Sequence, residues 1–199
     1  RRSSTPNFWR LDYLKIFEKI KLISIDITDS KSISDAIKIS DPDEIYNLAA
    51  QSFVATSFNQ PIYTSEVTGL GVTRILDEIR GYDKKIKFYQ ASSSEIYGNV
   101  KAKIQNENTP FNPSSPYAIA KLYGYWIVNL YRKAYGLHAT NGILFNHESP
   151  IRGLEFVTRK VSNGVAKISL GLAKELKIGN LSPKRDWGYA PEFVEGMWM

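Results

Sequence analysis

The stretch KIKFYQASSSEIYG, residues 85–98, joins an apolar run to a cluster of hydroxyls and a carboxylate. Its first half is rich in β-branched and aromatic residues, which predicts a buried strand. The segment PYAIAKLYGYWIVNLYRKAYG, residues 116–136, has apolar residues at helical spacing, with proline near its start and glycine at its end. It carries Tyr117 and Lys121, four residues apart. A strand, a polar turn and a helix in this order are the repeating unit of an α/β fold.

The same alternation runs through the rest of the chain. Closely spaced β-branched residues predict strands over residues 21–29, 44–50, 85–91 and 138–145. Apolar residues at helical spacing predict helices over residues 32–40, 57–80, 116–136, 155–171 and 191–199. This order predicts an α/β fold with a doubly wound parallel sheet of Rossmann-like type. Ligands bind such sheets beyond the carboxyl ends of the strands, so the residues at those ends are the candidates for a site.

Composition limits the function. The 199 residues are 43% hydrophobic and 23% charged, as in ordinary globular proteins, and no apolar run reaches the roughly 18 residues of a membrane span. The absence of cysteine excludes disulfides and thiolate metal sites and fits the reducing cytoplasm, where we expect the protein. With only two histidines, we expect no metal site.

The net charge of +6 has several interpretations. It suits a nucleic acid, a phosphate-bearing small molecule, or simply a lysine-rich surface. Basic and aromatic residues do not interleave as they do in nucleic-acid-binding proteins. We therefore expect no nucleic-acid partner and no membrane partner.

Tyr117 and Lys121 would share one helix face, because residues four apart lie one turn from each other. An ammonium near a phenol favours the phenolate and lowers the tyrosine pKa from its usual value of about 10. Such a tyrosine can act as a base near neutral pH. The spacing alone is not specific, since a surface pair would show it, and Tyr97 and Lys101 repeat it. The glycine after Tyr97 predicts a turn there instead of a helix.

Ser93 and Glu95 follow the strand predicted over residues 85–91. The Ser93 hydroxyl could hydrogen-bond a substrate oxygen and the Tyr117 phenol, or it could cap a turn. Glu95 could take a proton from a carbon next to a ketone, or it could be a solvated loop charge. Taken in order, the hydroxyl, the carboxylate and Tyr-x-x-x-Lys predict one active site.

These segments resemble the extended short-chain dehydrogenase/reductase family. RRSS, EIYNLAAQS, KFYQASSSEIYG, SPYAIAKLYGYWIVN, NGILFNHESP and KRDWGYA stand in the order and approximate spacing of one branch, the GDP-mannose 4,6-dehydratases. The resemblance covers nearly the whole chain, and KLYGYW, NGILFNHESP and KRDWG separate this branch from generic sugar-nucleotide epimerases. It implies an NADP-dependent, redox-neutral conversion of GDP-D-mannose to GDP-4-keto-6-deoxy-D-mannose and water.

The resemblance also implies roles for single residues. Tyr117 would be the base, with Lys121 as its electrostatic partner. Glu95 would be the acid–base at C5 and C6, and Ser93 the hydroxyl of the triad. The residues implied to contact the cofactor are Arg2 and Ser3 at the 2′-phosphate, Asp26 and Ile27 near the adenine, and Ala49, Ala50, Gln51, Tyr117 and Lys121. Those implied to contact GDP-mannose are Asn146, Lys160 and Arg185.

By the same resemblance, residues 1–150 form an incomplete NADP-binding domain and residues 151–199 begin the portion that binds the GDP-sugar. The family's first strand and glycine-rich turn would precede Arg1, and a C-terminal portion would follow Met199, so we interpret the chain as a fragment. The glycines of GLGVTR, residues 69–74, lie inside a helical pattern and are predicted to be close-packing positions. We therefore expect the fragment alone neither to bind NADP tightly nor to turn over.

Several positions depart from the family's usual residues. Ser93 stands for a threonine, which keeps the hydroxyl but loses the β-branch. Ser114 and Ile151 stand for arginines, and Phe53 for a histidine, which bears on phosphate and subunit contacts. The resemblance implies a homodimer or homotetramer of the full-length protein.

The alternatives are another NDP-sugar dehydratase or epimerase of the same family, an inactive fragment, or a basic binding protein on a degenerate dehydrogenase scaffold. Glu95, close after the hydroxyl of Ser93, favours a dehydratase.

Overall fold

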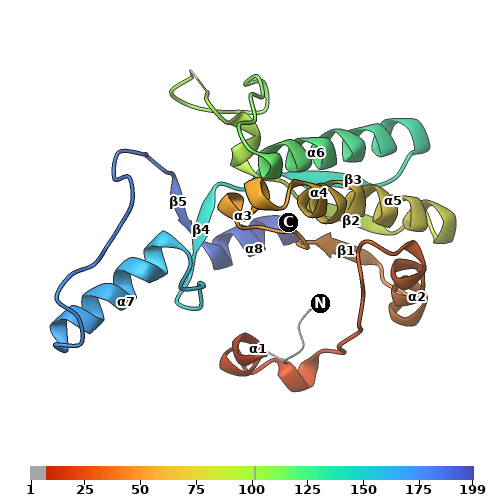
Figure 1. Cartoon of the computed structure of the whole chain (residues 1–199). Helices are drawn as coiled ribbons and strands as arrows, with labels where there is room; N and C mark the ends of the chain where they lie inside the picture. The colour runs from red at the N-terminus through yellow and green to blue at the C-terminus, as the bar shows by residue number, and fades with distance from the viewer. Residues whose placement is uncertain (1–7, 101) are drawn as a thin grey trace. The chain divides into compact units, whose positions relative to one another are not determined.

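The computed structural model describes residues 8–100 and 102–199, so the predictions for Arg2, Ser3 and Lys101 fall outside the described residues. The chain forms two compact units, residues 1–144 and residues 145–199 (Figure 1). Within the described ranges, no helix has the length and apolar character needed to cross a membrane.

The first unit is built on a three-stranded parallel sheet. Its strands are β1 (Glu44–Asn47), β2 (Lys87–Ala91) and β3 (Ala139–Gly142), side by side in that order. Asn47 lies opposite Gln90, which in turn lies opposite Asn141. The carboxyl ends of the three strands therefore meet at one edge of the sheet, where the sequence predicted a site.

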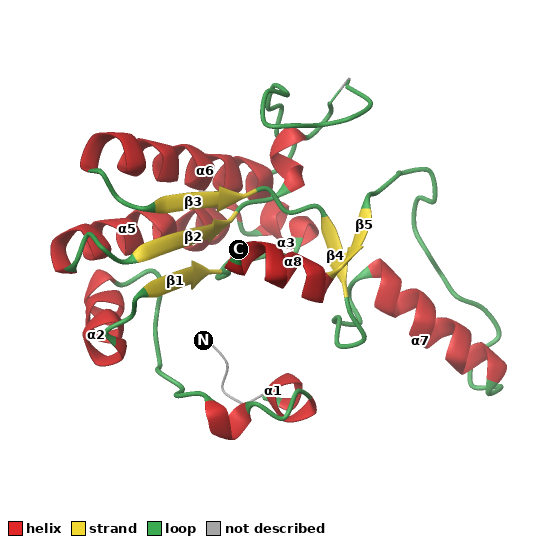
Figure 2. Ribbon diagram, turned by 180° about the vertical axis from the view of Figure 1, so that it is seen from behind, coloured by secondary structure: helices red, strands yellow, loops and turns green. Residues whose placement is uncertain are grey.

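Three helices cover one face of this sheet. They are α2 (Ser30–Ser40), α5 (Gly71–Tyr82) and α6 (Pro116–Tyr135) (Figures 1 and 2). Burying an aliphatic or aromatic side chain stabilises a fold by about 1.5–3 kcal/mol. The side chains buried in this core are Ile33, Ile37, Val72, Ile75, Leu76, Ile79, Ile86, Phe88, Val128, Tyr131, Leu137 and Ala139.

Helix α6 begins and ends at the residues that the sequence predicted. The Ala118 N–H donates to Ser115 Oγ at 3.1 Å, and Pro116 occupies the first turn, where no N–H is needed. Gly136 ends the helix with a φ of 72°, in the left-handed region that suits glycine. These caps fix where Tyr117 and Lys121 enter the site.

The single helix predicted over residues 57–80 is wrong in detail. The segment instead forms α3 (Val54–Asn59), α4 (Pro61–Thr64), the π-helical η2 (Ser65–Leu70) and α5. A break falls before Pro61, because proline has no N–H to donate to the preceding turn.

The glycines of GLGVTR were predicted to be close-packing positions, which is confirmed for Gly71, whereas at Gly69 an added Cβ would make only an ordinary van der Waals contact. A Cβ on Gly69 would meet Tyr123 Cδ1 at 3.5 Å, and one on Gly71 would meet Ile27 Cγ1 at 2.9 Å.

The strand predicted over residues 21–29 is also wrong. That segment has no regular strand structure and follows two short helices, α1 (Trp9–Tyr13) and η1 (Phe17–Lys19). A strand needs a hydrogen-bonded neighbour, and no described strand pairs with this segment. Asp26 instead forms a turn. Its Oδ1 accepts from the Thr28 backbone N–H at 2.9 Å and from the Thr28 hydroxyl at 2.7 Å.

The second unit holds a smaller parallel pair. Its strands are β4 (Asn146–Glu148) and β5 (Trp187–Tyr189), accompanied by α7 (Val157–Ser169) and α8 (Ala190–Trp198). The strand predicted over residues 138–145 therefore ends earlier, at Gly142, and β4 is a separate strand.

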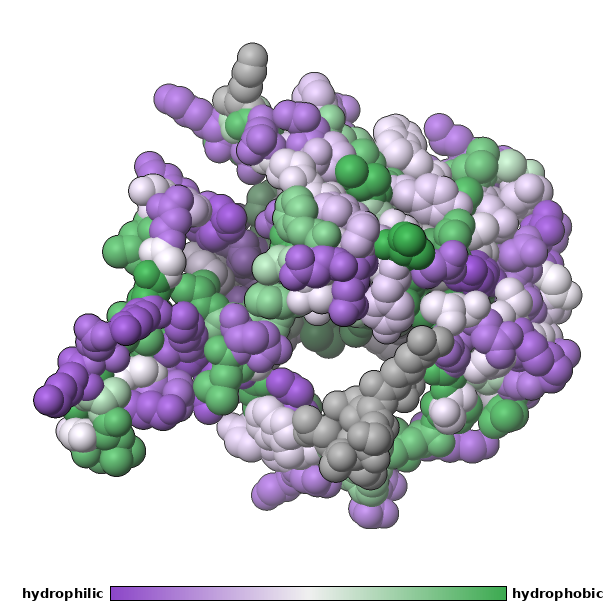
Figure 3. Space-filling view, viewed as in Figure 1, coloured by the Kyte–Doolittle hydropathy of each residue, from purple (hydrophilic) through white to green (hydrophobic). Residues whose placement is uncertain are grey.

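His147 of β4 stacks on Phe193 of α8 with ring centroids 5.0 Å apart. Figure 3 shows mostly hydrophilic side chains over α7.

Candidate active site

The strand end of β2 and the first turns of α6 place four predicted residues at one end of the first unit. Ser93 and Glu95 lie at and in the short 3-10 helix η3 (Ser94–Tyr97), directly after β2. The Ser94 N–H donates to the Leu144 carbonyl at 2.9 Å, which anchors this turn to the chain beyond β3. Tyr117 and Lys121 project from the start of α6.

Tyr117 and Lys121 are buried, so they are not a surface pair. Their exposed fractions are 9% and 4%. Lys121 Nζ lies 5.8 Å from the centroid of the Tyr117 ring and donates to the Ala91 carbonyl at 2.7 Å. Burial lowers the pKa of the Lys121 ammonium to about 8, because an apolar surrounding disfavours the charged form.

Ser93 caps η3, which was one of its two interpretations. Its Oγ accepts from the Glu95 N–H at 3.2 Å. Accepting that bond leaves the hydroxyl proton able to donate elsewhere, so the cap does not exclude a role at the substrate. Glu95 is partly buried in the first turn of η3, which is not the position of a fully solvated loop charge.

A tight turn after η3 requires glycine. Gly98 has a φ of 52°, and a Cβ there would lie 1.8 Å from the Asn112 carbonyl oxygen. The turn predicted after Tyr97 is thus confirmed. Tyr97 is itself buried, and its hydroxyl donates to the Asn106 carbonyl at 2.9 Å. This contact explains Tyr97 as a structural residue of the loop.

The loop after β1 is held by three hydrogen bonds that involve side chains. The Ala49 N–H donates to Asn47 Oδ1 at 3.2 Å. The Gln51 N–H donates to Thr68 Oγ1 at 3.1 Å, and Gln51 Nε2 donates to Thr64 Oγ1 at 3.2 Å. The residues predicted to contact the cofactor at this strand end therefore have a fixed backbone.

Two buried amides at this edge were not singled out from the sequence. Asn47 Nδ2 donates to Gln90 Oε1 at 2.8 Å, and Gln90 Nε2 donates to the Ala91 carbonyl at 3.1 Å. The sequence did indicate these residues, because each amide residue lies at or near the end of an apolar strand. A buried amide must find a partner, so two of them on neighbouring strands indicate a pair.

The second unit holds the three residues predicted for the GDP-sugar. Asn146 begins β4 and is partly buried. Lys160 is exposed in the first turns of α7, and Arg185 is exposed in the segment before β5, where its Nη1 donates to the Lys184 carbonyl at 2.8 Å.

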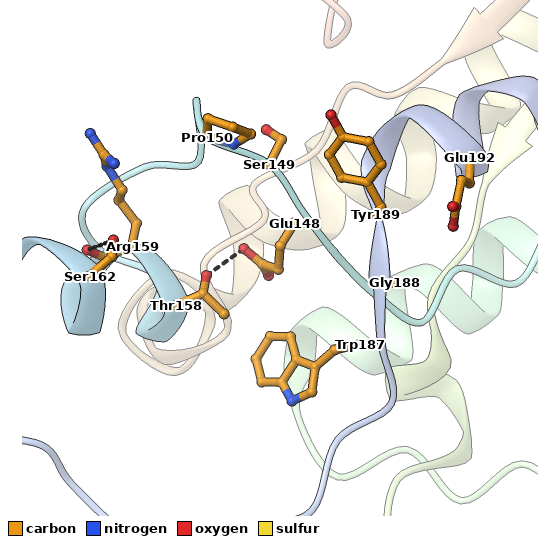
Figure 4. Close-up of a pocket in the computed structure, with 10 residues that line it drawn as sticks. All are labelled: Glu148, Ser149, Pro150, Thr158, Arg159, Ser162, Trp187, Gly188, Tyr189 and Glu192. Carbon is orange, nitrogen blue, oxygen red and sulfur yellow. Dashed lines mark hydrogen bonds between the residues drawn. The ribbon is translucent and has the colours of Figure 1, made fainter.

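A hollow of about 470 Å³ lies within the second unit (Figure 4). Glu148 accepts there from Thr158 Oγ1 at 2.6 Å and pairs with Arg152 Nε at 3.2 Å. The residues that line it are Glu148, Ser149, Pro150, Thr158, Arg159, Ser162, Trp187, Gly188, Tyr189 and Glu192. Asn146, Lys160 and Arg185 are not among them.

Across residues 8–100 and 102–199, no three acidic or histidine side chains gather as a metal site would require.

Comparison with known proteins identifies the family. All 199 residues match the model of the family described as GDP-mannose 4,6 dehydratase. The chain is 53% identical to the GDP-mannose 4,6 dehydratase of Drosophila melanogaster and 56% identical to the GDP-mannose 4,6-dehydratase of Sinorhizobium fredii (strain HH103). In both cases all of this chain is covered, but only 52% and 59% of the relative. The chain thus spans little more than half the length of the curated relatives that it matches.

Solved structures share the fold. RMD from Pseudomonas aeruginosa, complexed with NADPH, superposes with a TM-score of 0.82 at 23% identity, covering 92% of this chain and 66% of that one. The dTDP-glucose 4,6-dehydratase of Bacillus anthracis str. Ames, complexed with NAD, superposes with a TM-score of 0.81 at 23% identity, covering 98% and 59%. At this identity the likeness confirms the Rossmann-like α/β fold and nothing more.

Proposed function

The chain belongs to the GDP-mannose 4,6-dehydratase family, and from this premise we propose that the full-length protein converts GDP-D-mannose to GDP-4-keto-6-deoxy-D-mannose and water. The observation that carries the proposal is the family match over all 199 residues. The structure adds support, because Ser93, Glu95, Tyr117 and Lys121 lie at the ends of adjoining elements, as one active site requires.

The donor set at Lys121 fits a nicotinamide cofactor. An ammonium carries three donor protons, and the bond to Ala91 uses one of them. A buried cation needs further acceptors, and ribose hydroxyls provide them without adding charge. We assign the nicotinamide–ribose end to Tyr117, Lys121 and residues 49–51, and the adenine end to Asp26 and Ile27. When bound, the nicotinamide supplies hydride removal at C4 of the sugar and hydride return at C6.

NADP, rather than NAD, is the form that we propose. The solved relatives of this fold include one complexed with NADPH and one complexed with NAD, so the fold itself does not decide. Arg2 and Ser3 offer guanidinium and hydroxyl groups for a 2′-phosphate. To test this choice, the cofactor is removed from the full-length enzyme. The kcat/KM for GDP-mannose conversion is then compared after NADP or NAD is added back.

The chain's own residues move the protons. Tyr117 takes the proton of the C4 hydroxyl, and the neighbouring Lys121 ammonium stabilises the phenolate. The C4 ketone then acidifies the C5 hydrogen, which Glu95 removes as a proton and passes to the C6 hydroxyl, so that this group leaves as water. C5 later regains a proton from solvent, which balances the proton that Tyr117 took from the C4 hydroxyl and releases. Ser93 donates its hydroxyl proton to the substrate oxygen at C4. Atoms balance, since the net change is the loss of one water.

The second unit is proposed to bind the nucleotide. Lys160 and Arg185 are exposed cations that suit a diphosphate, and Asn146 offers an amide to a base or a sugar. With these assignments, we propose that residues 1–150, apart from Asn146, bind the cofactor and that residues 151–199 begin the GDP-sugar portion.

We propose a homodimer or homotetramer for the full-length protein. Helix α6 carries an exposed apolar stripe at helical spacing, made by Ile119, Tyr123, Trp126 and Leu130. A second copy of this chain would cover it, and light scattering after gel filtration measures the mass directly. A cytoplasmic location is supported by the lack of cysteine.

The deciding experiment is an assay of the full-length protein with GDP-mannose. We expect release of GDP-4-keto-6-deoxymannose, detected by mass spectrometry, and its loss in Tyr117→Phe. Tyr135→Phe, on the same helix but exposed, is the matched control and should keep full turnover. A panel of UDP- and dTDP-sugars separates this activity from the epimerases and other dehydratases. Normal turnover by Tyr117→Phe would refute the mechanism.

A further inference from the structure

The ladder between β1 and β2 stops one step earlier than its register allows. Asn47 lies opposite Gln90, so the next bond of a regular parallel ladder would join the Ala49 N–H to the Ala91 carbonyl. The Ala49 N–H instead donates to Asn47 Oδ1, at 3.2 Å. The Asn47 side chain thus turns the backbone donor away from the Ala91 carbonyl, at the end of β2 that precedes Ser93.

The Ala91 carbonyl takes two side-chain donors in its place. Lys121 Nζ donates at 2.7 Å and Gln90 Nε2 at 3.1 Å, which uses both lone pairs of the oxygen. Gln90 is oriented in turn by Asn47, whose Nδ2 donates to Gln90 Oε1 at 2.8 Å. Asn47 and Gln90 are 4% and 1% exposed, so bulk water does not compete for these bonds.

Asn47 therefore acts twice in one network. Its oxygen diverts the Ala49 N–H, and its nitrogen orients Gln90 toward Ala91. We infer that Asn47 and Gln90 are positioning residues that set where the Lys121 ammonium is held, by reserving the Ala91 carbonyl as its acceptor. The catalytic consequence rests on the proposed function, whereas the effect on Lys121 itself does not.

Three variants of the full-length protein separate the two actions. Gln90→Met keeps the side-chain volume but removes both amide contacts. Asn47→Ala releases the Ala49 N–H to complete the ladder at Ala91, in competition with Lys121. Asn47→Ser keeps a hydroxyl that can accept the Ala49 N–H two residues on. We expect kcat to fall roughly tenfold in Gln90→Met and Asn47→Ala, with the KM for GDP-mannose within about twofold, and Asn47→Ser to recover part of the loss.

The second readout does not need turnover. Acetic anhydride labels lysines at a rate that follows accessibility, and mass spectrometry compares Lys121 with the other lysines of the same molecule. We expect Lys121 to label several-fold faster in Gln90→Met and Asn47→Ala than in the wild type. Asn141→Leu is the matched control. Asn141 lies opposite Gln90 on β3, but its Nδ2 donates to the Tyr125 carbonyl, at 3.1 Å. Its loss should lower the melting temperature and leave Lys121 labelling unchanged.

The outcomes are distinct. Unchanged kcat and unchanged Lys121 labelling in folded Gln90→Met and Asn47→Ala would overturn the inference. If Gln90→Met does not fold, the comparison of Asn47→Ala with Asn47→Ser decides, and equal labelling in both refutes it. If the wild type does not convert GDP-mannose but the labelling changes as expected, the proposed function fails and the positioning of Lys121 stands.

Discussion

The two units hold their functional candidates in opposite ways. In the first unit, Tyr117 and Lys121 are buried at 9% and 4% exposure, and the lysine is tied to the end of a strand. In the second unit, Lys160 and Arg185 are exposed side chains on α7 and on the segment before β5. Proton transfer requires groups placed within hydrogen-bond reach, whereas a cation attracts a phosphate over a longer distance.

The difference has an energetic counterpart. A buried ammonium such as Lys121 lowers the stability of the folded state because it has lost its water. An exposed lysine such as Lys160 has almost no such cost, since its charge remains hydrated. Substitutions in the first unit should therefore change both kcat and stability. Substitutions at the exposed cations of the second unit should change the KM and leave stability alone.

The largest effect is expected for Glu95→Gln in the full-length protein. The amide cannot accept the C5 proton, so kcat should fall by about a thousandfold while the KM for GDP-mannose changes little. NMR in D₂O measures the accompanying loss of deuterium incorporation at C5. Glu107→Gln, an exposed glutamate in the same unit, is the control and should retain turnover. C5 exchange at the wild-type rate in Glu95→Gln would assign the base elsewhere.

Lys121→Met should sharpen the comparison through pH. Burial lowers the pKa of Lys121 to about 8 from 10.5, so the unfolded chain binds this proton more tightly than the folded one. Stability therefore rises with pH between those values, and the cost of the buried charge is complete below pH 8. Methionine removes that titration. The stability of wild type relative to Lys121→Met should rise by about 2 kcal/mol between pH 7 and pH 10.

Urea unfolding of the two proteins at several pH values measures this difference. Other groups titrate in both proteins and cancel. A difference that stays constant from pH 7 to pH 10 would show that Lys121 is not desolvated. Activity in the methionine variant should fall at every pH, though by less than in Glu95→Gln, because the phenolate of Tyr117 loses its cation.

Lys160→Gln and Arg185→Gln test the second unit. Each removes one exposed cation proposed for the diphosphate, so the KM for GDP-mannose should rise roughly tenfold and kcat should stay within about twofold. Raising the salt concentration should weaken the wild type more than the variants, because exposed charges are screened. Lys167→Gln, farther along α7, is the matched control. A large fall in kcat without a change in KM would place these residues with the catalytic group instead.

Local signals determined much of the fold. The start and end of α6 follow from Pro116 and Gly136, whose backbone restrictions act within a few residues. The segment over residues 21–29 has the composition of a strand but no described partner, and pairing is a long-range property that composition does not contain. The break at Pro61 could have been predicted from the sequence, because a proline inside a helical pattern indicates that the helix ends or kinks there.

The candidate site was predictable as an order of residues and not as a network. Ser93, Glu95, Tyr117 and Lys121 stand at a strand end and a helix start, which is a matter of position along the chain. The sequence places Asn47 and Gln90 at or near the ends of two predicted strands, but their hydrogen bond depends on the register of those strands, whose paired residues are 43 positions apart. The exposure of Lys160 and Arg185 likewise depends on how the second unit folds.

The smallest effect is expected for Ser93→Thr. Ser93 has an extended backbone, with φ −151° and ψ 143°, which β-branched residues favour. Threonine keeps the hydroxyl that caps η3, so stability should change by less than about 0.5 kcal/mol and kcat by less than about threefold. Ser93→Ala removes both the cap and the hydroxyl, and should cost about 1 kcal/mol of stability and about a hundredfold in kcat. Urea unfolding and initial rates of the three proteins, measured side by side, separate the two roles. Because the cap and the substrate contact use one oxygen, an alanine variant that loses stability but keeps kcat would leave Ser93 as a cap alone and assign the catalytic hydroxyl to another residue.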